Sequence, residues 1–214
     1  MAYRTTPARM DRDLKLRERI LGCALKRVAD GGFSSLTMVA LADDVGIATG
    51  SLYRHFHSKG ELAAEVFATA SGREVDALRV VLRGSEGSPA ERLSRGVRQF
   101  AARAWSSRSL AFALIAEPVE PEVDEQRLFY REAYGELFCD LLVEGVALGE
   151  FQVGQPRVVA ACLVGAIAES LVGPLSPPAW AAREAGRPSV ELAAVSDALA
   201  TFCLRAVGAK EPHP

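Results

Sequence analysis

One stretch of the chain, residues 36–62, limits the possible folds more than any other. It reads LTMVALADDVGIATGSLYRHFHSKGEL. Apolar side chains recur here at positions i, i+3, i+4 and i+7, namely Met38, Leu41, Ala42 and Val45. This spacing puts one apolar stripe on a helix of about two turns, and Thr37 can cap its first turn. The stretch therefore predicts a short helix that packs by one side.

The glycine at position 46 predicts where that helix ends. Gly46 tolerates the left-handed conformation found just past a helix terminus, so residues 44–47 are expected to form a turn. A second helix should follow at once, because Leu52 and Phe56 lie four residues apart and can face inward with Ile47. The sequence thus predicts two short helices joined by a tight turn.

The outward positions of the second helix carry hydroxyls, a cation and ring donors but no carboxylate, namely Thr49, Gly50, Ser51, Tyr53, Arg54 and His55. Such a face suits contact with phosphates and base edges. Ser58, with Glu61 three residues later, predicts a capping box for a third helix, with Lys59 at its N-terminus.

The run L-A-x-x-V-G-I-A-x-G-S-L-Y-R-H-F-x-S-K-x-E-L resembles the helix-turn-helix of the tetracycline-repressor (TetR) family of bacterial regulators. The resemblance covers about residues 15–65. It implies an N-terminal DNA-binding domain, placed at 1–60, and an all-helical domain at 61–214 that dimerises and holds an effector. It also implies release of operator DNA under control of that effector.

The same resemblance implies the residues of the DNA-binding face: Thr37, Ala48, Thr49, Gly50, Ser51, Tyr53, His55 and Lys59. Thr37, Tyr53, His55 and Lys59 should meet phosphates, and 49–51 should approach base edges. The chain departs from the family pattern at Ala48, where Ser is usual, and at Thr49, where Lys is frequent. We leave open whether Thr49 supplies the missing cap. Val39 also stands where a polar or basic residue is common.

Charge is divided unevenly along the chain. Residues 1–60 hold 10 Lys/Arg and 6 Asp/Glu, a balance of +4, while 61–214 hold 15 and 21, a balance of −6. A basic head on an acidic body fits an N-terminal contact with nucleic acid better than it fits a uniformly anionic enzyme.

Helical periods continue through the rest of the chain and no strand pattern appears, so the predicted class is all-α with about nine helices. Apart from the two short helices, the expected helices include 13–29, 58–82, 121–149, 155–173 and 189–207. An arm of about a dozen polar residues, with Arg4, Arg9 and Arg12, should precede them. A segment around Trp180 should lead to the last helix.

The body helices offer aromatic and apolar side chains with few charges, which favours a small, mostly apolar or aromatic effector held by one or two polar groups. The candidate effector-binding residues are Phe100, Arg103, Trp105, Phe112, Tyr130, Tyr134, Phe138 and Cys162. Each aromatic residue taken alone is equally well explained as ordinary core.

Two late helices carry more apolar residues than one-sided packing needs, which predicts a homodimer in which the last two helices of each subunit form a four-helix interface. The candidate interface residues are Val159, Leu163, Ala166, Ile167, Leu199, Phe202, Cys203 and Ala206. A two-fold protein implies a pseudo-palindromic operator.

Other site types find no support in the pattern, so we expect no catalytic residue, metal or cofactor. His55 and His57 are two apart and diverge on a helix, and residues 46–50 lack the preceding strand and third glycine of a dinucleotide loop. The four cysteines are predicted to be buried free thiols: Cys23, Cys139, Cys162 and Cys203. The longest uncharged run, 158–168, is short for a bilayer span, and no signal peptide is evident, so a cytoplasmic protein is expected.

Two functions remain. One is a ligand-responsive dimeric repressor that binds double-stranded operator DNA. The other is a helical protein whose head contacts another protein. Large exposed apolar side chains on the second short helix would favour the protein partner, whereas polar ones favour DNA.

Overall fold

The computed structural model describes residues 7–209, which form ten α-helices and one short 3₁₀ helix and contain no strand. The predicted all-α class is therefore confirmed. In chain order the elements are α1 (Pro7–Gly31), η1 (Phe33–Ser35), α2 (Met38–Val45), α3 (Thr49–Leu52), α4 (Lys59–Leu82), α5 (Pro89–Ser106), α6 (Arg108–Ala116), α7 (Pro121–Ala147), α8 (Pro156–Leu175), α9 (Pro177–Glu184) and α10 (Leu192–Ala206).

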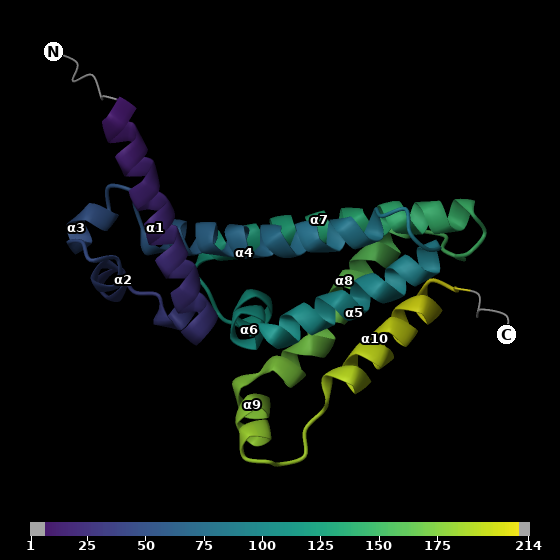
Figure 1. Ribbon diagram of the computed structural model, residues 1–214. Helices are drawn as coiled ribbons and strands as arrows, with labels where there is room; N and C mark the ends of the chain where they lie inside the picture. Colours follow the sequence, from purple (N-terminus) through teal and green to yellow (C-terminus); the bar gives the residue numbers. More distant parts are fainter. Residues whose placement is uncertain (1–6, 210–214) are drawn as a thin grey trace.

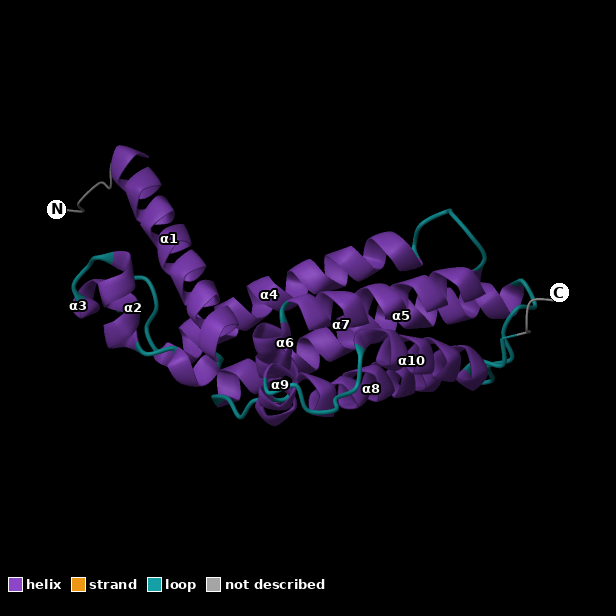
Figure 2. Cartoon of the chain, turned by 60° about the horizontal axis from the view of Figure 1, so that its bottom comes forward, coloured by secondary structure: helices purple, strands orange, loops and turns teal. Residues whose placement is uncertain are grey.

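The helices form a small head and a longer helical body (Figure 1). Helices α1 to α3 make the head, and α4 runs from the head along α7. Helices α5 and α10 lie side by side in both views, with α8 packed against α7 and α10 (Figures 1 and 2). Helix α6 contacts both α1 of the head and α8 of the body, so it joins the two parts.

Two apolar cores fill these parts. The head core includes Ile20, Leu41, Leu52 and Phe56, all with no exposed surface, and it also takes in Val123 of α7. The second core fills the space between α4, α5, α7, α8 and α10. Because the head core extends onto α7, the head is packed firmly on the body.

One predicted boundary is wrong, and one helix was not predicted. Helix α1 begins at Pro7, not at residue 13, because proline is tolerated in a first helical turn and the polar residues after it continue the helix. Arg9 and Arg12 thus lie on a helix, while Arg4 falls outside the described residues. The segment around Trp180 is a helix of its own, α9, which brings the described α-helices to ten.

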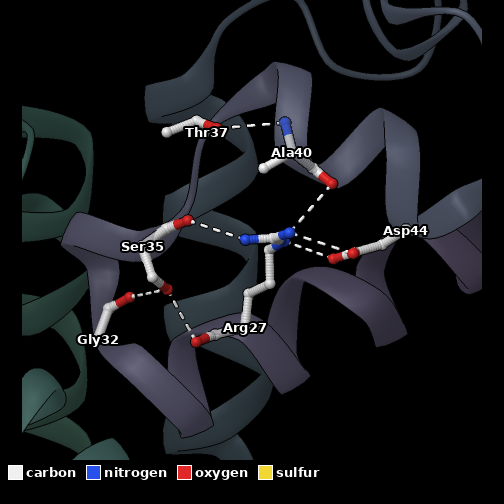
Figure 3. Close-up of polar contacts among 6 residues, drawn as sticks. All are labelled: Arg27, Gly32, Ser35, Thr37, Ala40 and Asp44. Atoms are coloured by element: carbon white, nitrogen blue, oxygen red, sulfur yellow. Dashed lines mark hydrogen bonds and ion pairs between the residues drawn. The ribbon is translucent and has the colours of Figure 1, made fainter.

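One arginine fixes α1 against α2 (Figure 3). The Arg27 guanidinium forms an ion pair with Asp44 and donates to the carbonyls of Ala40, at 3.2 Å, and Ser35, at 3.4 Å. The Ser35 hydroxyl donates in turn to the Gly32 carbonyl at 2.7 Å. This network ends α1, turns the chain and sets the angle at which α2 leaves.

The four cysteines are free, but only Cys203 is buried, and burial raises the pKa of its thiol to about 11. Cys162 is exposed on α8, and Cys23 and Cys139 are half-buried, so the prediction of four buried thiols is wrong. Helical spacing identified an apolar surrounding but not which side of each helix is covered.

Candidate nucleic-acid interface and ligand cavity

The first helix of the motif forms as its capping residues predict. Thr37 is the N-cap of α2, and its hydroxyl oxygen accepts a hydrogen bond from the Ala40 amide at 3.2 Å. The hydroxyl proton stays available to a phosphate oxygen on the exposed side. Gly46 ends α2 in the left-handed conformation, at φ 73°, and the chain turns directly into α3.

The second helix of the motif is held by its inner side. Leu52 and Phe56 are fully buried and Ile47 packs against the same core, as predicted. The side chain of Tyr53 is 48% exposed on the outer side. The other predicted contact residues fall into two groups. Thr37, Ala48 and Gly50 are exposed, and the rest are half-buried, namely Thr49, Ser51, His55 and Lys59. No carboxylate lies on this face between residues 48 and 55.

Helix α3 begins without a side-chain cap. Ala48 is its N-cap residue and Thr49 is the first helical residue, so Thr49 does not replace the missing serine. The Ser51 amide donates to the Ala48 carbonyl at 2.8 Å. The Thr49 and Gly50 amides therefore remain at the N-terminus of α3, where an anion is favoured.

The capping box predicted for α4 is only half formed. The Ser58 hydroxyl accepts from the Glu61 amide at 2.9 Å, as expected. The Glu61 carboxylate, however, accepts from the backbone amide and the ring Nδ1 of His57, at 2.6 and 2.9 Å, and not from the Ser58 amide. These contacts lower the pKa of Glu61 and fix His57, which leaves the ring 88% exposed at the edge of the face.

Two cationic side chains of this face differ in whether they are already paired with another residue. Lys59 forms an ion pair with Glu120 of the body at 2.7 Å, so a phosphate contact by Lys59 must compete with that carboxylate. Arg54 is exposed next to Tyr53, and its guanidinium makes no hydrogen bond or ion pair within residues 7–209. Sequence reasoning placed Arg54 on the outer side but left it out of the contact set. Its free guanidinium adds a cation to this face.

A cavity of about 120 Å³ lies in the body between α4, α5, α6, α7 and α8. Its wall is mostly apolar, with Phe67, Leu78, Leu110, Leu114, Ile115 and Val164 among the lining residues. Five of the predicted effector-binding residues line it, namely Phe100, Arg103, Tyr130, Tyr134 and Phe138.

Three predicted effector-binding residues do not line the cavity. Trp105 packs under the guanidinium of Arg183 from α9, at 4.2 Å from the ring centre. Phe112 lies against the body core, and Cys162 is exposed on the far side of α8. Sequence reasoning identified the right helices but could not tell which side of each one faces the cavity.

The polar groups of the cavity come from α4, α5 and α7. Arg103 donates twice to the Glu74 carboxylate, at 2.6 and 2.7 Å, and this raises the pKa of Arg103. Burial raises the pKa of the Tyr134 hydroxyl, so that group stays protonated and available as a donor. Arg127 and Arg131 line the cavity one turn apart on α7, and neither was among the predicted residues. Their spacing of four was the signal that sequence reasoning missed.

The predicted dimer stripe must be corrected at four positions. Leu163, Ile167, Leu199 and Cys203 are 0 to 4% exposed because they form the core of the protomer itself. They cannot face a second copy. Val159 and Ala166 are half-buried, whereas Phe202 is 52% exposed and Ala206 is also exposed.

Beside the charged Arg157, Glu169, Asp197 and Arg205, the exposed sides of α8 and α10 nevertheless carry many apolar or small residues. On α8 they include Val158, Ala161, Cys162 and Gly165; on α10 they include Ala194, Ala198, Thr201 and Phe202. Only 28% of the most apolar part of α8 is buried, although its mean hydropathy is 2.0. By length and composition α8 could cross a bilayer, which corrects the expectation that no run is long enough. A helix with this much exposed apolar surface is expected to pack against a further partner.

An exposed helix without carboxylates, held on a rigid two-helix support next to a body with its own cavity, is the arrangement of a helix-turn-helix regulator of transcription. Residues 20–66 match the model of "Bacterial regulatory proteins, tetR family", and residues 86–172 match "Tetracyclin repressor-like, C-terminal domain". The chain belongs to the TetR family. It is also 28% identical over 140 residues to the HTH-type transcriptional repressor KstR2 of Mycolicibacterium smegmatis, across 64% of this chain and 67% of KstR2.

Solved structures share the fold. FadR of Bacillus subtilis, in complex with stearoyl-CoA, aligns with a TM-score of 0.71 at 18% identity, over 89% of this chain and 98% of FadR. RolR in complex with resorcinol aligns with a TM-score of 0.63 at 18% identity, over 94% of this chain and 92% of RolR. Together with the family models, they confirm an N-terminal helix-turn-helix followed by a helical C-terminal domain.

Proposed function

We propose that this chain is a repressor that binds a pseudo-palindromic operator as a homodimer and is released by a small, mostly apolar ligand. The observation that carries the proposal is the face formed by α3 and the turn after it. Its outer side presents hydroxyls, Tyr53 and the free guanidinium of Arg54, while Leu52 and Phe56 anchor it from below. Phosphate contacts from such groups position a helix, and Thr49 to Ser51 would meet base edges.

The dimer is proposed to form through the exposed sides of α8 and α10. Small residues such as Ala161, Gly165 and Ala198 allow these helices to approach those of a second copy closely. Phe202 would then be buried by the partner. A two-fold dimer presents two α3 helices, which fits half-sites about one helical turn, or a multiple of it, apart.

The proposed domains follow the family: residues 1–60 bind DNA, and residues 61–214 bind the ligand and form the dimer. Helix α6 supports a link between the two, because Leu110, Leu114 and Ile115 line the cavity while the same helix contacts α1. A ligand that favours a different position of α6 would shift the spacing of the two heads, since only differential affinity moves such an equilibrium. This activity places the protein in the cytoplasm, with its DNA.

The neighbours show what this fold can hold, from the long acyl chain of stearoyl-CoA in FadR to resorcinol in RolR. By comparison, a cavity of about 120 Å³ is close to one that takes a single benzene ring, about 150 Å³. We therefore expect a compact ligand, or a longer one that widens the cavity as it binds.

A mobility-shift titration with DNA from the region upstream of the chain's own gene tests the proposal. We expect a retarded complex that resists excess random duplex. Equal affinity for random duplex would contradict operator binding and would favour the alternative, a head that contacts another protein.

A further inference from the structure

The charges that line the cavity do not balance. Three arginines and one glutamate face it: Arg103, Arg127, Arg131 and Glu74. Arg103 is held by Glu74 through two hydrogen bonds, so that pair is neutral as a unit. Of the two arginines of α7, Arg127 is paired with Asp124, which does not line the cavity, so the uncompensated positive charge is that of Arg131.

Arg127 is already fully engaged. Its Nε donates to the Leu114 carbonyl at 3.1 Å, one terminal nitrogen pairs with Asp124 at 2.7 Å, and the other donates to the Glu117 carbonyl at 3.0 Å. These bonds fasten the C-terminal end of α6 to α7. They leave little capacity for a ligand.

Arg131 has no such partner. Its side chain makes no hydrogen bond or ion pair within the described part of the chain. Its neighbours at i±3 and i±4 on α7 are Arg127, Leu128, Tyr134 and Gly135, and none of them is acidic. It is exposed while lining the cavity, so it stands at the cavity mouth with its donors free.

The surroundings also disfavour two adjacent cations. Burial, with a contribution from Arg131, lowers the pKa of Arg127. An anion at the mouth would offset this repulsion, whereas a neutral or cationic group would not. Tyr134 adds a protonated hydroxyl on the same wall.

We propose that the ligand of this cavity is an amphipathic anion: an apolar body that fills the space between α4, α6 and α8, with a carboxylate bound by the free guanidinium of Arg131. The inference rests on the proposed ligand-controlled function and names the chemical class of the ligand. A bidentate arginine–carboxylate contact is charge-assisted and geometrically selective, so it distinguishes an acid from an alcohol of equal length.

The test uses three probes with the same chain: octanoate, octan-1-ol and octylamine, titrated into the full-length protein by calorimetry at neutral pH. We expect octanoate to bind at least tenfold more tightly than either of the others. Arg131→Gln should remove this preference by weakening octanoate alone, and Arg131→Lys should retain part of it. The control is Arg73→Gln, because Arg73 is exposed on α4 and does not line the cavity.

The outcomes separate the two proposals. The proposal of an anionic ligand is wrong if octan-1-ol binds as tightly as octanoate, or if Arg131→Gln leaves octanoate binding unchanged. The cavity would still be a ligand site in either case. If none of the probes binds, the amphipathic class is wrong, whereas the proposed operator binding is tested separately by the mobility-shift titration. Octanoyl-CoA is the fourth probe, because its negative charge lies on phosphates and not on a carboxylate. If octanoyl-CoA binds more tightly than octanoate, and Arg131→Gln removes that difference, the anion bound by Arg131 is a phosphate.

Discussion

The carboxylate of Glu117, at the end of α6, accepts a hydrogen bond from the backbone amide of Phe33 at 2.8 Å. The adjacent amide of Ser34 donates to the same carboxylate at 3.0 Å. The two residues are 84 positions apart in the chain, yet this contact joins the wall of the cavity to the corner between α1 and α2. It is a direct polar link between body and head, beside the ion pairs Arg17–Glu65 and Lys59–Glu120.

Replacing Glu117 with alanine should loosen that corner. Both amides would lose a charged acceptor, a contact worth about 1.5 to 3 kcal/mol when shielded and less at this partly exposed site. Hydrogen exchange at Phe33 and Ser34 should therefore become faster, and ligand should release DNA less completely. Glu125→Ala is the matched control, because Glu125 is exposed on α7. If the Phe33 and Ser34 amides exchange equally slowly in both variants, Glu117 does not connect the body to the head.

Gly32 is required for the same contact. Its φ is +71°, and a Cβ at this position would lie 2.4 Å from Oε2 of Glu117. Gly32→Ala should cost about 1 to 2 kcal/mol from the left-handed backbone alone, and it should also displace the carboxylate. Gly22→Ala should instead be tolerated, because Gly22 lies in the middle of α1 and nothing lies within 4 Å of the Cβ that alanine would add. Thermal unfolding should show a lower midpoint for the first variant and a slightly higher one for the second.

Substitutions on the proposed DNA face should separate affinity from specificity. Arg54→Ala and Tyr53→Ala should weaken binding to all sequences, and Arg54→Ala should reduce the salt dependence by about one phosphate contact. Ser51→Ala should instead change the preference at one or two base pairs by about 1 to 3 kcal/mol. Lys59→Ala should have a smaller effect than Arg54→Ala because Lys59 is paired with Glu120. Fluorescence anisotropy across a salt series measures all four, and unchanged affinity throughout would place DNA on another surface.

A charge in the exposed stripe of α10 should dissociate the dimer. Phe202→Glu would leave an unpaired carboxylate in the interface, at a cost of roughly 3 kcal/mol or more in association. Val80→Glu is the control, because Val80 is 76% exposed on α4 and lies outside the proposed interface. In sedimentation velocity, Phe202→Glu should run as a monomer, whereas the wild-type chain and Val80→Glu should run as dimers. A wild-type chain that sediments as a monomer at micromolar concentration would count against the dimer altogether.

The sequence predicted the parts of the fold that depend on local signals. Thr37 and Gly46 bracket α2 at the expected positions because a cap and a left-handed glycine act within a single turn. Leu199 and Cys203 were misplaced at an interface because periodicity identifies an apolar side but not the surface that covers it. The contact of Glu117 with Phe33 had no signal in the sequence, since it joins η1 to the end of α6, which only tertiary packing brings together.

The most direct test of the account is selection of bound duplexes from a randomised DNA library by the purified chain. We predict enrichment of one sequence with two-fold symmetry, with half-sites about 10 bp or a multiple of that apart. This enrichment should be lost when Ser51 and Arg54 are both replaced by alanine. Recovery of a library without enrichment, or of a single unrepeated half-site, would contradict a dimeric operator-binding repressor.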